Sequence, residues 1–505
     1  MKINRMTKYT AISTIISLIM RGLGLGFSVF LTRKKGSEGI GLMTLITSVY
    51  ALGVSFSAAG YRLATTRLAV EDENSKSPDA LTLILKILTL ALITGTLAAF
   101  FMRMGSEFIA VNILKEPRSA QALKTLSVSL PFLALSGVLC AYLGAFYKVV
   151  KIGIVQGVSQ ICQIIYVALS LKEGFLVEEC CNKIAVGSVL GEFAALLIAV
   201  FFVFSQIKNK KRVRSNKKFF APFIRIALPD ALGYELRSAL STIQQLLVPI
   251  GFRKSGASAS VALSVYGIMH GMALQIVLFP SCILRSLSSL LVPVITESRS
   301  LGNELKTKTT IRRVLHMTLA FSFMISSIMF FCADALAIAL YNTPECAAFL
   351  RLFSPLIPIM YLDICADSML KGLDKQVASM GYNLLDSIVS VVMVYFLIPK
   401  YQVTGYVIMV FFTETMNTLL SVWKLIKVSN VGLSPYYDIV NPIICALGAG
   451  AICFFVTKTI PNTPIGLVIK LLFNILTYVS LMLMSSPETK ENLFSMFGIR
   501  HKAIS

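Results

Sequence analysis

The stretch from Tyr382 to Val428 reads YNLLDSIVSVVMVYFLIPKYQVTGYVIMVFFTETMNTLLSVWKLIKV. It covers most of two apolar runs, near residues 377–398 and 403–428, which meet around Pro399. A helix needs about twenty consecutive apolar residues to cross the hydrocarbon core of a bilayer. Both runs reach that length, so this part of the chain predicts two successive membrane-spanning helices.

Runs of the same kind recur along the whole 505-residue chain. We expect about fourteen spans, near residues 9–32, 40–64, 81–102, 125–147, 152–171, 184–206, 221–251, 261–294, 314–341, 347–370, 377–398, 403–428, 439–457 and 464–485. The predicted fold class is therefore all-α, a polytopic membrane protein.

Composition supports a membrane protein and argues against a soluble one. Hydrophobic residues make up 56% of the chain and charged residues 14%, against about 25% charged in ordinary globular proteins. Mean hydropathy is +0.76. The formal net charge is +22, but the basic residues lie mainly in short loops between apolar runs. We interpret them as topology signals with some affinity for anionic lipid, and not as a nucleic-acid-binding face.

Those basic loops predict the orientation, because cytoplasmic loops are enriched in Lys and Arg. The segments Lys208–Lys218 and Arg299–Arg313 fall on the same side as the basic residues near both chain ends. We expect a multi-pass protein of the bacterial inner membrane with both termini in the cytoplasm. Residues 33–35 (Arg-Lys-Lys), predicted outside, are the main exception.

The first twelve spans are predicted to form two lobes of six. Gly41 and Glu71 bracket span two as Gly267 and Glu297 bracket span eight, at an offset of 226 in the numbering. The sequences LGAFYK (from Leu143) and LKGLDK (from Leu370) match at an offset of 227. Paired repeats are how many transporters build a central site. The predicted domains are an N-lobe (1–207), a basic cytoplasmic linker (208–220), a C-lobe (221–430) and two extra C-terminal helices with a tail (431–505).

No catalytic, metal-binding or nucleotide-binding motif is found, so we expect a protein that is not an enzyme and has no cofactor. Without an enzymatic energy source, transport would be driven by a coupling cation, by a proton or by the membrane potential. The ten cysteines show no metal spacing. Cys180, Cys181 and Cys346 fall in or beside loops predicted outside, where free thiols are favoured over a disulfide because adjacent cysteines rarely bridge.

Four arginines lie inside or near spans in the first two helices of each predicted lobe: Arg21, Arg62, Arg237 and Arg285. A charge at the centre of a membrane helix costs about 2.5–3.5 kcal/mol on insertion scales. If these helices face one another, the arginines line one cavity suited to a phosphate-bearing headgroup. The alternative is that they snorkel or pair with acids such as Glu235.

Other residues in the spans have two readings as well. Asp363 and Asp367, one helical turn apart, and Glu235 are candidates for ion coupling, or else partners of buried polar groups. His270 is a candidate for substrate contact, or a hydrogen-bonded packing residue. Gly22, Gly24 and Gly26 weaken their helix and predict a hinge, or close helix packing.

The stretch from Tyr382 to Val428, with its Asn…Asp-Ser opening, Leu-Ile-Pro exit and Gly-Tyr re-entry, resembles the multidrug/oligosaccharidyl-lipid/polysaccharide (MOP) exporter superfamily. More narrowly, it is similar to the stage V sporulation protein B family of lipid II flippase-like proteins from spore-forming bacteria. PLIPIMYLDICADSMLKGLDKQ, from Pro355 to Gln376, resembles that family's tenth span. The resemblance covers essentially the whole chain.

The resemblance implies two six-helix lobes around a V-shaped cavity and an undecaprenyl-pyrophosphate-linked sugar as cargo. In lipid II flippases, arginines of the first, second and eighth spans line the cavity. Arg21 matches best, because its Met-Arg-Gly-Leu-Gly context resembles the family's Ser-Arg-x-x-Gly, with Met20 in place of Ser. Arg62 and Arg285 match by position only.

These observations predict a flippase that moves a polyprenyl-pyrophosphate-linked glycan from the cytoplasmic to the outer leaflet by alternating access. A lipid II-type peptidoglycan precursor for the spore cortex is the expected cargo. The expected partners are this lipid, membrane lipids and peptidoglycan synthases, without nucleic acid. Alternatives are a cation-coupled multidrug exporter of the same superfamily and a flippase for O-antigen or capsule precursors. A membrane scaffold or a polyprenyl-phosphate glycosyltransferase is a further alternative, although the large acidic loops of a glycosyltransferase are absent.

Overall fold

A computed structural model describes residues 2–58, 60–73, 80–171, 176–207, 220–432 and 434–485. Every regular element in these ranges is a helix, which confirms the predicted all-α class. The predicted basic segment Lys208–Lys218 and the C-terminal tail lie outside the described residues. None of the ten cysteines forms a disulfide, Cys180, Cys181 and Cys346 included.

The helices form two compact units, which differ from the predicted lobes because α8 (Phe220–Lys254) and α9 (Ala259–Tyr266) pack with the helices of the first half. The first unit contains residues 1–267 and 391–402, the second residues 268–390 and 403–505. The lobe boundaries proposed from the repeat remain a prediction.

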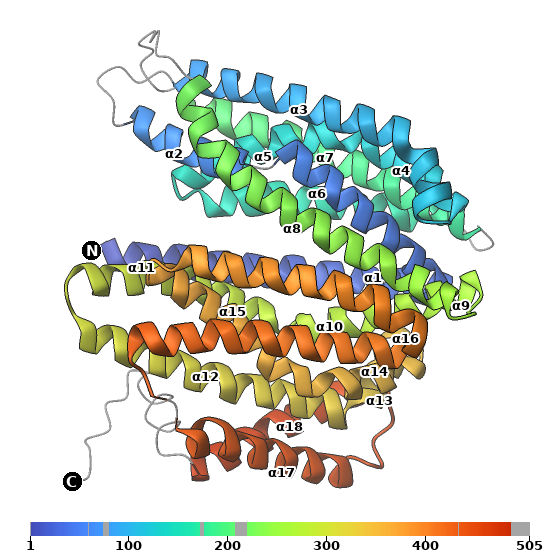
Figure 1. Cartoon of the computed structure of the whole chain (residues 1–505), viewed down its shortest axis with the longest axis vertical. Helices are drawn as coiled ribbons and strands as arrows, with labels where there is room; N and C mark the ends of the chain where they lie inside the picture. Colours follow the sequence, from blue (N-terminus) through green and yellow to red (C-terminus); the bar gives the residue numbers. More distant parts are fainter. Residues whose placement is uncertain are drawn as a thin grey trace. The chain divides into compact units, whose positions relative to one another are not determined.

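The first unit holds eleven elements in chain order (Figure 1). They are α1 (Lys2–Ala58), α2 (Tyr61–Glu73), α3 (Ala80–Phe108), the π-helical turn η1 (Ile109–Ile113), the 3-10 turn η2 (Pro117–Ser119), α4 (Ala120–Ser127), α5 (Ser129–Ala145), α6 (Val149–Ser170), α7 (Val177–Ile207), α8 (Phe220–Lys254) and α9 (Ala259–Tyr266).

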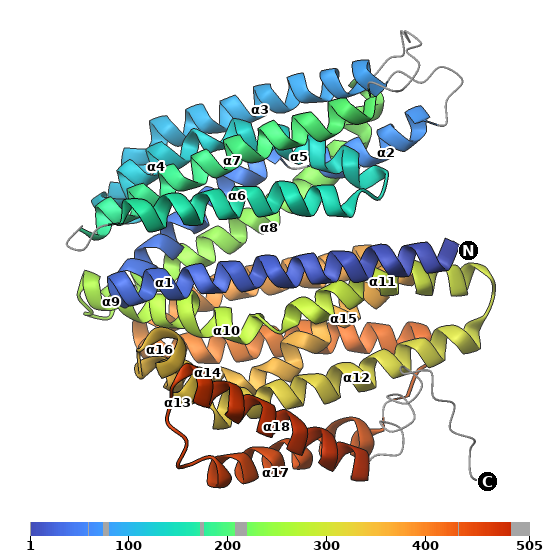
Figure 2. The ribbon, with the colours of Figure 1, turned by 180° about the vertical axis from the view of Figure 1, so that it is seen from behind.

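The remaining elements belong to the second unit, apart from the first residue of η3 and the middle of α16 (Figure 2). They are η3 (Gly267–Ala273), α10 (Leu274–Leu278), α11 (Ser281–Ser300), α12 (Glu304–Phe331), α13 (Ala333–Leu336), η4 (Ala337–Tyr341), α14 (Glu345–Phe353), η5 (Ser354–Leu356), α15 (Ile357–Gly372), α16 (Gln376–Ser429), η6 (Pro435–Val440), α17 (Asn441–Val456) and α18 (Pro464–Ser485).

Ten helices of the described chain are long and apolar enough to cross a membrane, or eleven if the bent pair Pro117–Ser127 and Ser129–Ala145 is one span. The expected number of about fourteen is not confirmed. Two of the ten are 60 and 54 residues long. Each contains a residue with non-helical backbone, Gly36 (φ 70°) and Gln402 (φ 50°), so each has the length of two crossings. Helix α8 is not among the ten; it carries several charged residues in its first half.

The two halves of the chain repeat the same turn geometry. Lys115 follows the π-helical turn η1 with a left-handed φ of 53°, and Asn342 follows η4 with a φ of 55°. Tyr147 (φ 55°) and Asp374 (φ 60°) end α5 and α15 in the same way. Both pairs have the same offset in the numbering as the LGAFYK and LKGLDK match. Backbone geometry therefore agrees with the repeat found in the sequence.

An ion pair recurs at the same offset. Glu107 of α3 pairs with Lys124 of α4 in the first half, and Asp334 of α13 pairs with Arg351 of α14 in the second. Each partner in the second half stands at the repeat offset from its counterpart in the first. The repeat thus includes side-chain contacts that hold the helices on either side of the π-helical turn.

The C-terminal hairpin of α17 and α18 packs against α12 within the second unit (Figure 2). His316 of α12 lies 2.8 Å from a carboxylate oxygen of Asp438 of η6, and both side chains are almost fully buried. The hydroxyl of Tyr478 donates to the carbonyl of Ala320 at 2.8 Å. These buried polar contacts fix the two extra helices, since an unpaired polar group in the membrane interior is costly.

Candidate functional site

The four predicted headgroup arginines all have exposed side chains. Arg21 is on α1, Arg62 on α2 and Arg237 on α8, all in the first unit. Arg285 is on α11 of the second unit. Their exposure is compatible with either the cavity or the snorkelling reading, so their role in binding remains a prediction.

The predicted hinge glycines lie in regular helix. A Cβ at Gly22 or Gly26 would meet nothing within 4 Å, whereas one at Gly24 would lie 3.2 Å from the amide nitrogen of Gln160 on α6. The backbone of α1 departs from helical geometry at Gly36 instead. Gly24 therefore has a packing contact, and a hinge role for the three glycines stays a prediction.

His270 lies in the π-helical turn η3 and is half-buried. Its Nε2 is 2.7 Å from the hydroxyl of Tyr406 on α16, and the two rings meet edge to face. Tyr406 is buried and packs in turn against Phe353. This geometry suits a hydrogen-bonded packing histidine, and substrate contact by His270 stays a prediction.

Asp363 and Asp367 share a helix but have different partners. Asn417 of α16 donates to Asp363 at 3.1 Å. Ser379 and Asn383, on the first part of α16, donate to Asp367 at 2.6 and 3.0 Å. In the described part of the chain, no group of three or more His, Cys, Asp or Glu side chains has the arrangement of a metal site.

A line of polar contacts joins the second half of α1 to α8 and α9; we call it the seam. The hydroxyls of Ser37 and Ser264 are 2.5 Å apart. Ser48 contacts the amide oxygen of Gln245 at 2.6 Å. The hydroxyl of Ser55 lies 2.9 Å from Oε2 of Glu235, the third ion-coupling candidate. The seam runs along one side of α1 and joins residues of the predicted N-lobe to residues of the predicted C-lobe.

Two glycines bring the seam helices into contact. A Cβ at Gly41 would lie 2.0 Å from the carbonyl oxygen of Leu263. A Cβ at Gly267 would lie 2.2 Å from the carbonyl oxygen of Ser37. Only glycine allows this approach, which is a common way for membrane helices to pack. The sequence had linked Gly41 and Gly267 as repeat counterparts, and here they pack against each other.

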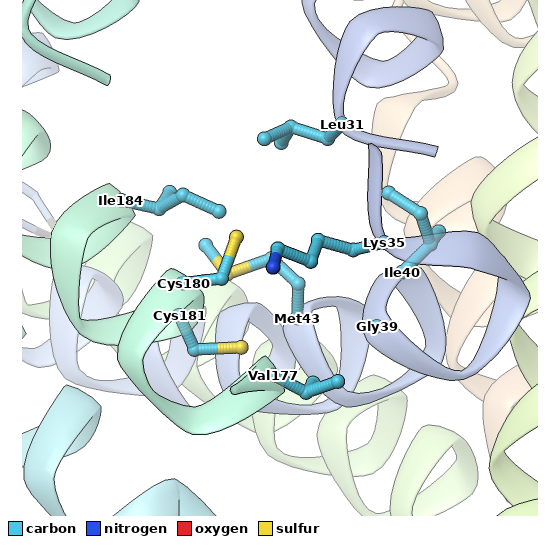
Figure 3. Close-up of a pocket in the computed structure, with 9 residues that line it drawn as sticks. All are labelled: Leu31, Lys35, Gly39, Ile40, Met43, Val177, Cys180, Cys181 and Ile184. Carbon is cyan, nitrogen blue, oxygen red and sulfur yellow. The ribbon is translucent and has the colours of Figure 1, made fainter. Parts of the chain in front are cut away.

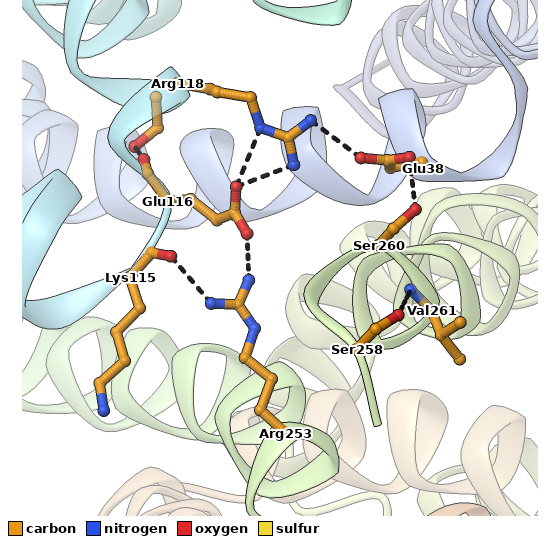
Figure 4. Close-up of polar contacts among 9 residues, drawn as sticks. Glu38, Lys115, Glu116, Arg118, Arg253, Ser258, Ser260 and Val261 are labelled. Atoms are coloured by element: carbon orange, nitrogen blue, oxygen red, sulfur yellow. Dashed lines mark hydrogen bonds and ion pairs between the residues drawn. The ribbon is translucent and has the colours of Figure 1, made fainter. Parts of the chain in front are cut away.

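Four charges close one end of the seam, and we call them the charge clamp: Glu38, Glu116, Arg118 and Arg253 (Figure 4). Arg118 donates to Glu38 and to Glu116, in each case at 2.9 Å. Arg253 donates to Glu116 and, at 2.8 Å, to the carbonyl of Lys115.

The clamp is neutral and joins three turns. Its two carboxylates and two guanidinium groups balance, and the Glu116 side chain is only 4% exposed. Ser260 of α9 donates to the second oxygen of Glu38 at 2.6 Å. The break in α1, the turn between α3 and α4, and the turn between α8 and α9 are thereby tied together. Removing one partner from a buried charge pair typically costs about 3–5 kcal/mol.

The clamp was missed by the sequence analysis. Its residues lie in or beside predicted loops, where charged side chains are ordinary, and no spacing links positions so far apart in the chain. One signal was available: the loops after spans one, three and seven were all predicted outside. They hold the acids and arginines that pair here.

A small pocket lies beside the break in α1 (Figure 3). Its cavity volume is about 10 Å³, far below the roughly 300–1,000 Å³ of typical small-molecule sites. Lys35, Cys180 and Cys181 are its polar lining residues, and the others are mostly apolar. Its size and lining do not suit a glycan headgroup.

Comparison with known proteins gives the fold. No family model matches the chain. Stage V sporulation protein B of Bacillus subtilis (strain 168) is 23% identical over 472 residues, which cover 90% of this chain and 89% of that protein. Sporulation protein YkvU of the same organism is 20% identical over 403 residues, covering 78% of this chain and 88% of its own length.

Solved structures match over most of the chain. The lipid II flippase MurJ in an inward closed conformation has a TM-score of 0.74 at 15% identity, covering 97% of this chain and all of that one. An inward-facing multidrug resistance MATE transporter of the MOP superfamily has a TM-score of 0.64 at 11% identity, covering 83% of this chain and all of that one. The chain therefore has the fold shared by MurJ and the MATE transporters, and is a multi-pass membrane protein, as predicted.

Proposed function

We propose that this protein is a flippase that moves a lipid-linked glycan across the bacterial cell membrane and is not an enzyme. The observation that carries the proposal is the extent of the match to MurJ. The match covers 97% of the chain, so it includes most of the two C-terminal helices. The sequence similarity to stage V sporulation protein B, over 90% of the chain, points the same way. The proposed cargo is a polyprenyl-pyrophosphate-linked glycan, with a lipid II-type precursor for spore cortex as the first candidate.

The membrane arginines support a pyrophosphate cargo. Arginine is always charged, and its planar guanidinium binds two phosphate oxygens at once. Arg21, Arg62 and Arg237 on α1, α2 and α8, and Arg285 on α11, are the proposed headgroup ligands; all have exposed side chains. An exporter of cationic drugs would favour acids at such positions.

We propose that transport works by alternating access. In this mechanism the second half of α1 separates from α8 and α9 along the seam. Serine hydroxyls and an amide make its contacts, and such groups find replacement partners in water when helices separate. An apolar seam would have no such compensation. With both termini in the cytoplasm, as the basic segments favour, the clamp lies at the outer end and closes the protein towards the outside.

The second candidate function is a cation-coupled multidrug exporter. The likeness to MATE transporters favours it, with a TM-score of 0.64 over 83% of the chain. The carboxylates of Asp363, Asp367 and Glu235 would then bind the coupling ion. Fewer residues of the chain are matched than for MurJ, and the arginines have no role in this reading.

The deciding experiment reconstitutes the purified chain in liposomes with fluorescent lipid II, with other polyprenyl-linked glycans and with a cationic dye. The proposal expects translocation of a polyprenyl-linked glycan and no dye transport. Dye transport without glycan translocation would favour the exporter. Comparing glycans that differ only in the sugar identifies the preferred cargo.

A further inference from the structure

Glu235 lies at the end of the seam opposite the clamp. Its partner Ser55 is 18 residues along α1 from Ser37, which is roughly 27 Å at 1.5 Å per residue. The seam thus extends through most of the thickness of a hydrocarbon core.

One oxygen of Glu235 lacks a hydrogen-bond donor. Oε2 contacts the Ser55 hydroxyl at 2.9 Å, while Oε1 is buried without a partner among the described residues. An ionised carboxylate is a pure acceptor with two oxygens to satisfy. A buried charge in this position would be left without compensation.

The hydroxyl of Ser55 has one hydrogen and two oxygens within reach. It lies 2.8 Å from the carbonyl oxygen of Leu52 and 2.9 Å from Oε2 of Glu235. A carbonyl can only accept, and so can an ionised carboxylate. With an ionised Glu235, the single hydroxyl hydrogen of Ser55 is shared between two acceptors. Each contact is a full hydrogen bond when Ser55 donates to Leu52 and Glu235, as a carboxylic acid, donates to Ser55.

The same arrangement occurs further along the seam with a neutral side chain. The hydroxyl of Ser48 lies 2.8 Å from the carbonyl of Thr44 and 2.6 Å from the amide of Gln245. An amide carries a donor and an acceptor of nearly the same shape, so it can supply a hydrogen to Ser48 by turning over. Glu235 can supply one only when protonated.

Among the described side chains, no charged group is paired with Glu235. On its own helix, Tyr234 and Arg237 are exposed, and the side chain of Asp230 lies outside the described residues. Other ionisable side chains of the described residues lie on the elements packed against α8, and none has a hydrogen bond or ion pair to Glu235. They are Arg21, Arg33, Lys34, Lys35, Glu38 and Tyr50 on α1, Tyr61, Arg62, Arg67 and Glu71 on α2, Tyr266 on α9, and Tyr395, Lys400 and Tyr401 on α16.

We propose that Glu235 holds a proton while the seam is closed and releases it to water when the seam opens. One proton is then bound on closing and released on opening, which makes opening of the seam sensitive to pH. This inference rests on the proposed function, because it takes the seam as the line that parts during transport.

The test measures opening directly and needs no cargo. Nitroxide labels are attached to cysteines introduced at Gln121 of α4 and Ala259 of α9, two exposed positions on either side of the clamp end. Distances are measured by pulsed electron paramagnetic resonance in liposomes, from acidic to alkaline buffer. The parent chain, which lacks the two introduced cysteines, is treated with the same label to measure the background signal from the native thiols. All of these thiols are buried or half-buried.

We expect a single short distance in acid and a growing longer distance in alkali. Glu235→Gln imitates the protonated acid and should lose the alkaline long-distance population. Glu192→Gln is the matched control, because Glu192 of α7 accepts from Ser159 at 2.9 Å away from the seam; it should open like the parent chain. A parent chain that never opens with pH, or a Glu235→Gln variant that opens like it, overturns the proposal.

Ser55→Ala gives a second test that depends on the direction of the hydrogen bond. If Glu235 donates to Ser55, the substitution removes an acceptor from the protonated form, and opening should shift to lower pH. If Ser55 donates to a carboxylate, the shift is to higher pH and the proposal is wrong. Glycan translocation by the parent chain is measured separately, so failure of the proposed function is distinguished from failure of this inference.

Discussion

The turns at Lys115 and Asn342 have the same backbone and different charges. Both follow a π-helical turn and take the left-handed conformation. In the first, Glu116 is buried between two arginines. At the corresponding position of the second, the hydroxyl of Thr343 donates to the nearby carbonyl of Tyr341. The repeated backbone is thus a scaffold, and a buried carboxylate with two arginine partners occurs at the turn of the first half and not at the corresponding turn of the second.

The intramembrane acids are distributed in the opposite way. Asp363 and Asp367 lie on α15 of the second half, and Ser136 and Cys140 occupy the corresponding positions on α5. Each half has therefore gained its own polar groups on a shared frame. If function lies in what the halves do not share, substitutions at unshared residues should have the largest effects.

The largest effect is expected at Arg21, for which both repeat offsets place an apolar residue, Leu247 or Val248, in the second half. Arg21→Ala should abolish glycan translocation while the protein still accumulates in the membrane. Arg21→Lys should recover only part of it, because lysine keeps the charge but loses the planar fork that holds two phosphate oxygens. Translocation at the parent rate by Arg21→Ala in liposomes would remove this residue from the site.

The next effect concerns the clamp and is one of stability. Arg253→Ala removes one of two cations that neutralise buried Glu116. We expect a loss of about 3 kcal/mol, at the low end for a broken buried pair because Arg118 remains. Thermal unfolding in detergent measures it. Thr343→Ala is the matched control in the other half, and should cost no more than about 0.5 kcal/mol. Equal losses in the two variants would mean that the two turns do not differ as described.

A smaller loss is expected where the two repeats touch. Gly41→Ala places a methyl group 2.0 Å from the Leu263 carbonyl, and overpacking of this kind costs about 1–3 kcal/mol. Gly22→Ala is the control on the same helix, since it meets nothing within 4 Å and gains helix propensity of about 1 kcal/mol. It should unfold at the same temperature or higher. Slower flipping by a stable Gly22→Ala protein would support the predicted hinge, whereas unchanged flipping would favour packing alone.

The sequence predicted what depends on local hydrophobicity and failed where contacts are distant. Apolar run length located the helices, and the match of LGAFYK with LKGLDK gave the offset that the turns at Tyr147 and Asp374 share. The break at Gly36 falls between the predicted spans 9–32 and 40–64. The helical conformation of the rest of residues 33–39 was not predicted, because a short charged segment between two apolar runs is equally compatible with a loop.

The candidate site was predicted less completely than the fold. Glu235 was identified because an acid inside a span is costly. Its contact with Ser55, 180 residues away, was not, because pairing across the seam depends on how α1 and α8 pack. Glu116 was missed for the same reason: its two arginines lie on either side of it in space, and one of them is 137 residues away in the chain.

The smallest effect is expected at the ion pairs that the halves share. Lys124→Ala and Arg351→Ala each break one copy of the repeated pair, and in both copies the side chains are substantially exposed. Exposed pairs contribute little, because water screens the charges and both side chains lose freedom in pairing. Neither variant should shift the unfolding temperature measurably, and the two should behave alike. A shift as large as that of Arg253→Ala in either variant would show that the shared frame, too, depends on charge. The two halves would then differ in how much each ion pair contributes to stability. The clamp would be one of several stabilising ion pairs and not a special feature.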